Sequence, residues 1–131
     1  MLTVDTRFFL THFLAGSEEL KSRTRKKMQE LQQERAIVPT IVIHEVYKFE
    51  HENVGRDVAE LRVATILRSN FSILELSSQI AIISGRLRCK YRTLPTADSI
   101  IAATAMEVKS LRVLSDDPHF QRIKEIKTEW V

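Results

Sequence analysis

The segment from Ile100 to Val108 constrains the fold most, because at helical spacing it leaves almost no polar face. A helix that is apolar on all sides has to be buried, and we expect this one to pack against a sheet. Thr96 follows the break at Pro95 and is the predicted N-cap of this helix. The apolar positions are Ile100, Ile101, Ala102, Ala103, Ala105 and Val108.

Short β-prone runs alternate with helical segments along the rest of the chain. The predicted strands cover residues 2–4, 36–38, 71–76 and 111–114, with a last edge strand within 124–131. The other predicted helices cover residues 6–14, 17–35, 41–50, 57–68 and 78–89, and residues 115–119 read as a polar turn. This alternation predicts an α/β fold in which helices flank both faces of a central, mostly parallel sheet.

Composition limits the class of protein. A chain of 131 residues with 44% hydrophobic and 28% charged residues suits one globular domain covering residues 1–131. Cys89 is the only cysteine, which excludes an intrachain disulfide and favours a reducing, cytoplasmic setting. No apolar run approaches the roughly 18 residues that span a bilayer, so we expect no membrane partner. The net charge of +3 is compatible with a polyanionic partner but does not by itself predict one.

Acidic residues follow two of the predicted strands. Asp5 ends the first strand, and Asp116 and Asp117 follow the strand 111–114. Ligand sites of parallel α/β sheets collect at the carboxyl ends of strands. We therefore expect these carboxylates to lie at one edge of the sheet.

Two further acids lie inside predicted helices. Asp98 is in the first turn of the apolar helix, and Glu45 lies between Ile43 and Val46. Carboxylates so close to buried surface are costly unless they are paired, hydrogen-bonded or bound to a cation. If all these acids converge, a hard divalent ion such as Mg²⁺ or Mn²⁺ relieves their repulsion. Such an ion can activate water and neutralise charge on a phosphodiester.

The ordered set of acids resembles the PIN domain, particularly the small nucleases typified by the VapC toxins of toxin–antitoxin pairs. The resemblance covers nearly the whole chain and implies a PIN-like three-layer fold. It is carried by Val4-Asp5-Thr6, Ile43-His44-Glu45, Thr96-Ala97-Asp98 with the apolar residues that follow, and Leu114-Ser115-Asp116-Asp117-Pro118-His119-Phe120.

The resemblance implies a metal-dependent endoribonuclease in which Asp5, Glu45 and Asp98 bind Mg²⁺ or Mn²⁺. The family pattern around the fourth acid points to Asp117, with Asp116 as the alternative. Thr6 matches a hydroxyl position that orients a carboxylate or a bound phosphate. An RNA substrate, a homodimer and an inhibitory small antitoxin protein are also implied.

Two alternative functions are weighed against this one. A PIN-fold module that binds RNA or protein with little catalysis has no need of mutually repelling carboxylates. A receiver-like or phosphatase-like domain with Asp5 as acceptor is disfavoured, because Thr6 and Arg7 follow it without a second aspartate. For any single acid, a helix cap or a solvated turn remains the simpler interpretation.

Several other polar residues have simpler interpretations. His44 adjoins Glu45, but neighbouring residues of a helix point in different directions. His12, His51 and His119 lack metal-ligand spacing and are expected at the surface or in turns. The basic run from Arg23 to Lys27 is expected to be a solvated helix face, with RNA binding as the alternative.

Overall fold

The computed structural model describes all residues, 1–131, as five strands and seven helices. In chain order these are β1 (Thr3–Val4), α1 (Thr6–Leu14), α2 (Glu18–Gln33), β2 (Ile37–Pro39), α3 (Thr40–Asn53), α4 (Arg56–Arg68), β3 (Ser72–Leu74), α5 (Ser78–Lys90), α6 (Thr96–Glu107), β4 (Arg112–Leu114), α7 (Pro118–Gln121) and β5 (Lys127–Glu129). Every predicted element is present. The turn expected at residues 115–119 is instead partly helical, because Asp117 caps the short helix α7.

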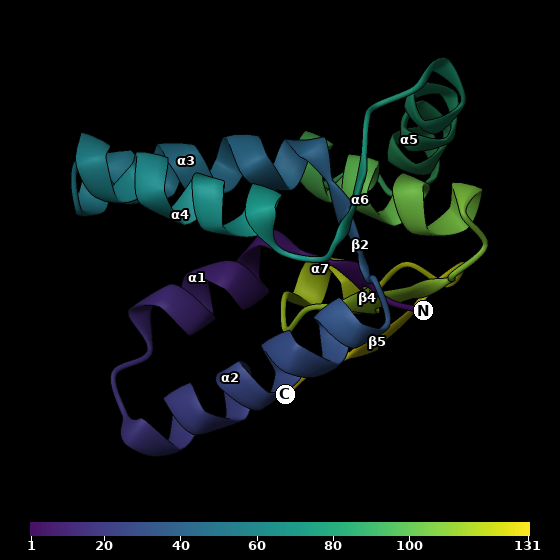
Figure 1. The fold of residues 1–131 in the computed structure, drawn as a ribbon. Helices are drawn as coiled ribbons and strands as arrows, with labels where there is room; N and C mark the ends of the chain where they lie inside the picture. The colour runs from purple at the N-terminus through teal and green to yellow at the C-terminus, as the bar shows by residue number, and fades with distance from the viewer.

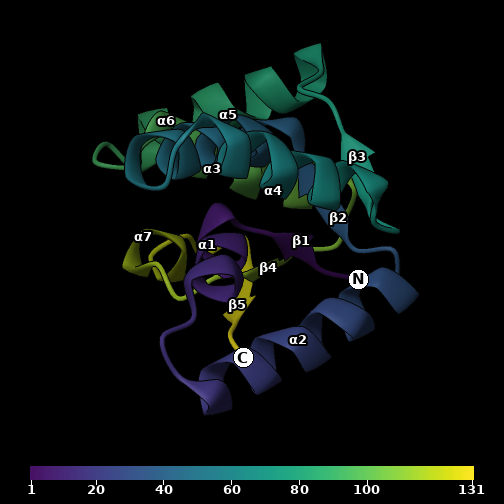
Figure 2. The same ribbon diagram turned by 60° about the vertical axis from the view of Figure 1, so that its left-hand side comes forward.

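The five strands form one sheet in the order β3-β2-β1-β4-β5, and every neighbouring pair is parallel. Helices α3, α4, α5 and α6 lie on one side of the sheet, and α1 and α2 lie on the other (Figures 1 and 2). The predicted three-layer α/β fold is therefore confirmed. The carboxyl ends of β1 and β4 are adjacent, which brings the residues after each strand together.

Helix α6 lies at the centre of the structure. Every residue from Asp98 to Ala105 is buried, as its apolar periodicity predicted. Thr96 was expected to be the N-cap, but it is the first helical residue and Pro95 occupies the cap position. Pro95 has extended backbone angles, and its carbonyl accepts the Ser99 N–H at 2.9 Å.

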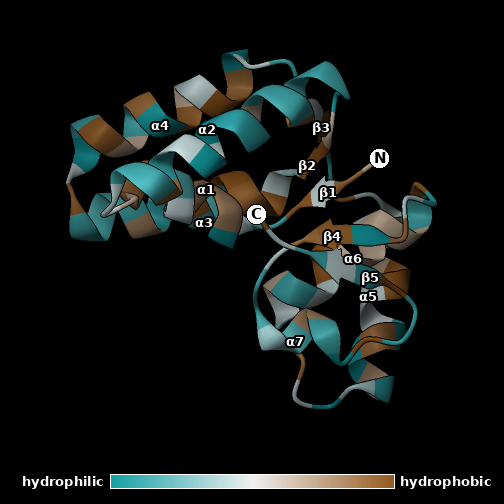
Figure 3. Ribbon diagram, turned by 90° about the horizontal axis from the view of Figure 1, so that it is seen from below, coloured by the Kyte–Doolittle hydropathy of each residue, from teal (hydrophilic) through white to brown (hydrophobic).

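Apolar side chains concentrate at the sheet, whereas α2 is mostly hydrophilic (Figure 3). One continuous core of 25 buried hydrophobic residues joins the two helical layers to the sheet. Within it Phe9 meets Phe8 and Phe71 edge to face, each at a centroid distance of 5.6 Å. No helix combines the length and the apolar character needed to cross a membrane.

Glu50 is an exception among the core residues. It lies on the same face of α3 as Val42 and Val46, and its exposed fraction is 0%. No hydrogen-bond donor of the protein contacts either oxygen of its carboxyl group. A buried polar group without a partner costs free energy that an apolar side chain of similar size does not.

We therefore expect Glu50→Met to raise the free energy of unfolding by about 1–3 kcal/mol. Urea denaturation followed by the fluorescence of Trp130, the only tryptophan, measures it. The matched control is Glu52→Met on the exposed side of α3, which should change stability by less than about 0.5 kcal/mol. Destabilisation by Glu50→Met would contradict the prediction.

Candidate metal centre

Asp5 and Ser115 join the ends of two neighbouring strands. Asp5 follows β1, is 2% exposed and occupies the N-cap position of α1. Ser115 follows β4, and its hydroxyl donates a hydrogen bond of 2.6 Å to Oδ2 of Asp5. The same hydroxyl oxygen accepts the backbone N–H of Asp117 at 3.0 Å. Ser115 therefore holds the loop after β4 against the first acid.

Glu45 reaches the same region from α3. Thr6, the first residue of α1, donates a hydrogen bond of 2.6 Å from Oγ1 to Oε1 of Glu45. The prediction that Thr6 orients a carboxylate is therefore confirmed. Glu45 also lies close enough to Asp5 for its negative charge to raise the pKa of Asp5.

Asp98, Asp117 and His119 form the tightest group. One ligand atom from each of the three lies within 4.8 Å of those of the other two. Nδ1 of His119 is 2.9 Å from Oδ1 of Asp117 and 3.3 Å from Oδ2 of Asp98. This nitrogen is buried, yet it forms no hydrogen bond of good geometry. His119 therefore lies next to two of the acids, a placement that its spacing in the sequence did not indicate, although its side chain is 40% exposed.

The two aspartates after β4 have different surroundings. Oδ1 of Asp117 accepts the backbone N–H of His119 at 2.9 Å, so this side chain caps α7 and faces Asp98. Asp116 is turned toward Arg7, whose Nε donates to its Oδ1 at 2.6 Å. Arg7 is thus close to the acids, as its position in the sequence suggested, but its direct partner is Asp116.

Burial and mutual repulsion perturb the acids. Burial, together with the charges of Asp117, Asp5 and Glu45, raises the pKa of Asp98 to about 7, although the charge of His119 acts in the opposite direction. Burial also raises the pKa of Asp5 to about 6, against the opposing hydrogen bond from Ser115. Four acids that are distant in the sequence therefore act on one another in a single site.

The family profile described as "PIN domain" matches residues 2–126. The chain belongs to the PIN-domain family. Among curated proteins, no significant sequence match to it was found.

Solved structures show the same fold as this PIN domain. VapBC2 from Rickettsia felis, bound to a DNA fragment from their promoter, aligns at a TM-score of 0.79 and 14% identity, over 98% of this chain and 96% of that one. DNA-bound VapBC from Salmonella typhimurium aligns at a TM-score of 0.74 and 23% sequence identity, over 99% of this chain and 98% of that one. FitAcB from Neisseria gonorrhoeae aligns at a TM-score of 0.73 and 20% sequence identity, over 98% of this chain and 96% of that one. At sequence identities this low, the similarity shows that the fold is shared and nothing more.

The donor set of the PIN-domain site fits a divalent cation. Carboxylate oxygens are the ligands that Mg²⁺ and Mn²⁺ prefer, and an imidazole nitrogen is a common ligand of transition metals. Nδ1 of His119, which is buried without a hydrogen bond of good geometry, and the raised pKa values of Asp5 and Asp98 both indicate groups that a cation would stabilise. Asp98, Asp117 and His119 are close enough to bind one ion together.

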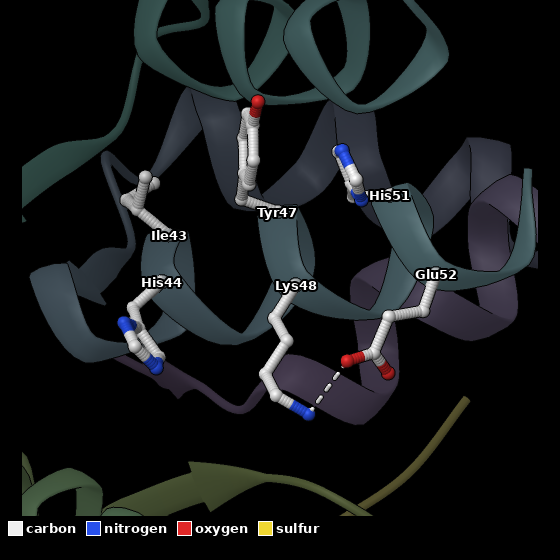
Figure 4. Close-up of a pocket in the computed structure, with 6 residues that line it drawn as sticks. All are labelled: Ile43, His44, Tyr47, Lys48, His51 and Glu52. Atoms are coloured by element: carbon white, nitrogen blue, oxygen red, sulfur yellow. Dashed lines mark ion pairs between the residues drawn. The ribbon is translucent and has the colours of Figure 1, made fainter. Parts of the chain in front are cut away.

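The largest hollow of the protein does not lie over these acids. It measures about 480 Å³ and covers the outer side of α3 (Figure 4). His44, Lys48 and Glu52 point to one side of α3 in this view, with Lys48 paired to Glu52 at 3.0 Å. His44 lines this hollow and Glu45 does not, in agreement with the expectation that these neighbours point in different directions.

The raised pKa values predict how pH affects the stability of the metal-free protein. The unfolded chain loses the protons of Asp5 and Asp98 near pH 3.8, whereas the folded protein keeps them to about pH 6 and about pH 7. Between these limits the unfolded state binds fewer protons, so these two groups lower the free energy of unfolding as pH rises. Above about pH 7 their destabilising effect is complete.

Asp98→Asn removes one of these charges, so its stability relative to the natural protein should increase between pH 4 and pH 7.5. The difference between a pKa of 3.8 and a pKa of about 7 corresponds to about 4 kcal/mol, and solvent screening reduces this value, so we expect a gain of about 1–3 kcal/mol at the upper limit. Urea denaturation in chelator at several pH values measures it. Asp57→Asn, an exposed acid of α4, is the control. A stability difference between Asp98→Asn and the natural protein that does not change with pH would contradict the raised pKa of Asp98.

Proposed function

We propose that this PIN domain is a metal-dependent endoribonuclease that cleaves RNA phosphodiester bonds. The observation that carries the proposal is the convergence of Asp5, Glu45, Asp98 and Asp117, whose mutual repulsion and burial raise the pKa of Asp98 to about 7. Membership of the PIN-domain family supports the same activity. A site of this kind costs stability, which a protein that only binds a partner has no reason to bear.

In this proposal Asp5, Glu45, Asp98 and Asp117 hold Mg²⁺ or Mn²⁺. Asp117 is favoured over Asp116 as the fourth ligand, because Asp116 is paired with Arg7 and Asp117 faces Asp98. When bound, the cation lowers the pKa of a water molecule and neutralises charge that develops on the phosphodiester.

The residues around the acids have positioning roles. Ser115 and Thr6 donate hydrogen bonds to Asp5 and Glu45, which fixes the orientation of each carboxylate. His119 adds a nitrogen between Asp98 and Asp117. Because such partners orient the ligands, replacing them is expected to weaken metal binding without removing a carboxylate oxygen.

RNA is the proposed substrate, and charge supports it. The chain carries a net charge of +3 although several of its acids are gathered in one site. The rest of the surface is therefore more basic than the total suggests, which favours a polyanionic strand. A membrane is not part of the proposal.

We further propose that the protein is the toxin of a VapBC-type pair, a homodimer inhibited by a small antitoxin protein. Support comes from the similarity of the fold to VapBC structures and to a Klebsiella pneumoniae toxin–antitoxin complex, with a TM-score of 0.66 and 23% identity. The antitoxin and the homodimer depend on this likeness alone.

The test is cleavage of single-stranded and structured RNA with Mg²⁺, with Mn²⁺ and with chelator. Asp98→Asn and Asp117→Asn should each reduce cleavage by about 100-fold or more, since even partners of metal ligands are worth 10–100-fold. The exposed neighbour Asp116→Asn should retain most of the activity. Asp57→Asn, on α4, is the control for an unrelated acid.

Metal binding is measured separately by thermal denaturation. Mn²⁺ at about 100 times its dissociation constant should stabilise the natural protein by about 2.7 kcal/mol, and Asp98→Asn by much less. Cleavage that survives both chelation and Asp98→Asn would reject the metal mechanism. Stabilisation by metal without cleavage of any RNA would instead favour the binding module.

A further inference from the structure

A groove leads away from the candidate metal centre between α1 and α3. It consists of two hollows of about 210 Å³ and about 330 Å³, which share Leu10 and Phe49 in their linings. Thr6 and Glu45 line its inner end, and Leu14 lines its outer end. The groove, called here the α1–α3 groove, therefore reaches Glu45, one of the acids of the site.

Apolar side chains line this groove although it is open to solvent. Phe49 is 37% exposed and Leu14 is 45% exposed, and Leu10 lies between them with part of its side chain buried. Exposed apolar surface costs free energy in water, and a ligand with an apolar face would cover it. An aromatic ring beside aliphatic side chains is a suitable surface for stacking a base.

A cation with unused donors lies at the opening of the groove. Arg7 lines the outer hollow, and its Nε donates to Asp116. Its two terminal nitrogens donate to no acceptor of the protein, and half of the side chain is exposed, at 51%. Lys48 lines the inner hollow and pairs only with Glu52, which is itself exposed. Both cations remain able to bind a phosphate.

We propose that the α1–α3 groove binds one nucleotide of a single-stranded RNA beside the cleaved bond, with its base on Phe49 and its phosphate on Arg7. The inference rests on the proposed function and extends it to a substrate subsite. A nucleotide matches the groove because it joins an apolar, planar base to an anionic phosphate. Base stacking accepts any sequence, so the subsite favours unpaired RNA over a particular base.

A protein segment is the other class of ligand that an apolar groove accepts. The nucleotide is favoured here because the inner end of the groove opens on Thr6 and Glu45, where a substrate strand has to pass. Arg7 and Lys48, which line the two hollows, also match a phosphate backbone. Binding of an apolar peptide side chain would use Leu14 and Phe49 but would not need the terminal nitrogens of Arg7.

The test compares two probes, a short fluorescein-labelled oligoadenylate and the same strand with abasic sites. Binding is measured by fluorescence anisotropy in the Asp98→Asn background, so that cleavage does not compete. Phe49→Ala should weaken binding of oligoadenylate by about 5- to 100-fold, which is the range for one stacked base. It should leave the abasic strand unchanged, whereas Arg7→Gln should weaken both probes alike.

Two further variants separate a specific effect from a general one. Phe49→Trp should restore binding of oligoadenylate, because it replaces the stacking surface. Leu67→Ala, at an exposed apolar residue of α4 outside the groove, should have no effect on either probe. Equal affinity of Phe49→Ala and its parent for oligoadenylate, or no binding by the parent, would overturn the proposal and leave the groove to a protein partner.

A cleavage assay distinguishes failure of this inference from failure of the proposed function. With Mn²⁺, Phe49→Ala in the otherwise natural protein should raise KM for oligoadenylate by about the factor measured in binding and leave kcat nearly unchanged. Normal cleavage with an unchanged KM would reject the subsite and leave the nuclease proposal intact. Absence of cleavage and of stabilisation by metal in the natural protein would reject the nuclease proposal instead.

Discussion

Burial and mutual repulsion of the carboxylates gathered in one site are the constraint on which the rest of this structure depends. Asp5 and Asp98 lie in surroundings that favour their protonated forms, with pKa values raised to about 6 and about 7. The hydrogen bond from Ser115 to Asp5 and the approach of His119 to Asp98 reduce this cost without removing it. The carboxyl edge of the sheet is therefore a region of unfavourable electrostatic energy, which a bound cation would relieve.

The core supplies the stability that tolerates such a site. Helix α6 carries Asp98 in its first turn, and its remaining residues as far as Ala105 pack against the sheet. The backbone of Asp98 is thereby held in place whether or not its side chain is charged. A rigid element that positions a strained group is a common arrangement in functional sites, where part of the stability is given up for activity.

The sequence predicted most of the fold because its signals are local. Hydrophobic periodicity located the helices, and α2 begins at the predicted place, where the Ser17 side chain accepts the Leu20 N–H. The predictions failed at two positions. Thr96 was expected to cap α6, but the helix begins one residue earlier than that, with Pro95 in the cap position. His119 was missed because α7 turns its ring toward Asp98, which is distant along the chain.

The neighbouring residues Asp116 and Asp117 show how one loop separates two similar side chains. The hydroxyl of Ser115 accepts the Asp117 N–H, and Asp117 in turn caps α7, so its carboxylate is directed inward. Asp116 is left outside, where Arg7 neutralises a charge that would otherwise add to the repulsion. That pair is exposed and contributes about 1 kcal/mol or less, so a phosphate can compete for Arg7 at little cost. In the proposed function, the same arginine would neutralise Asp116 in the free protein and bind an RNA phosphate in the complex.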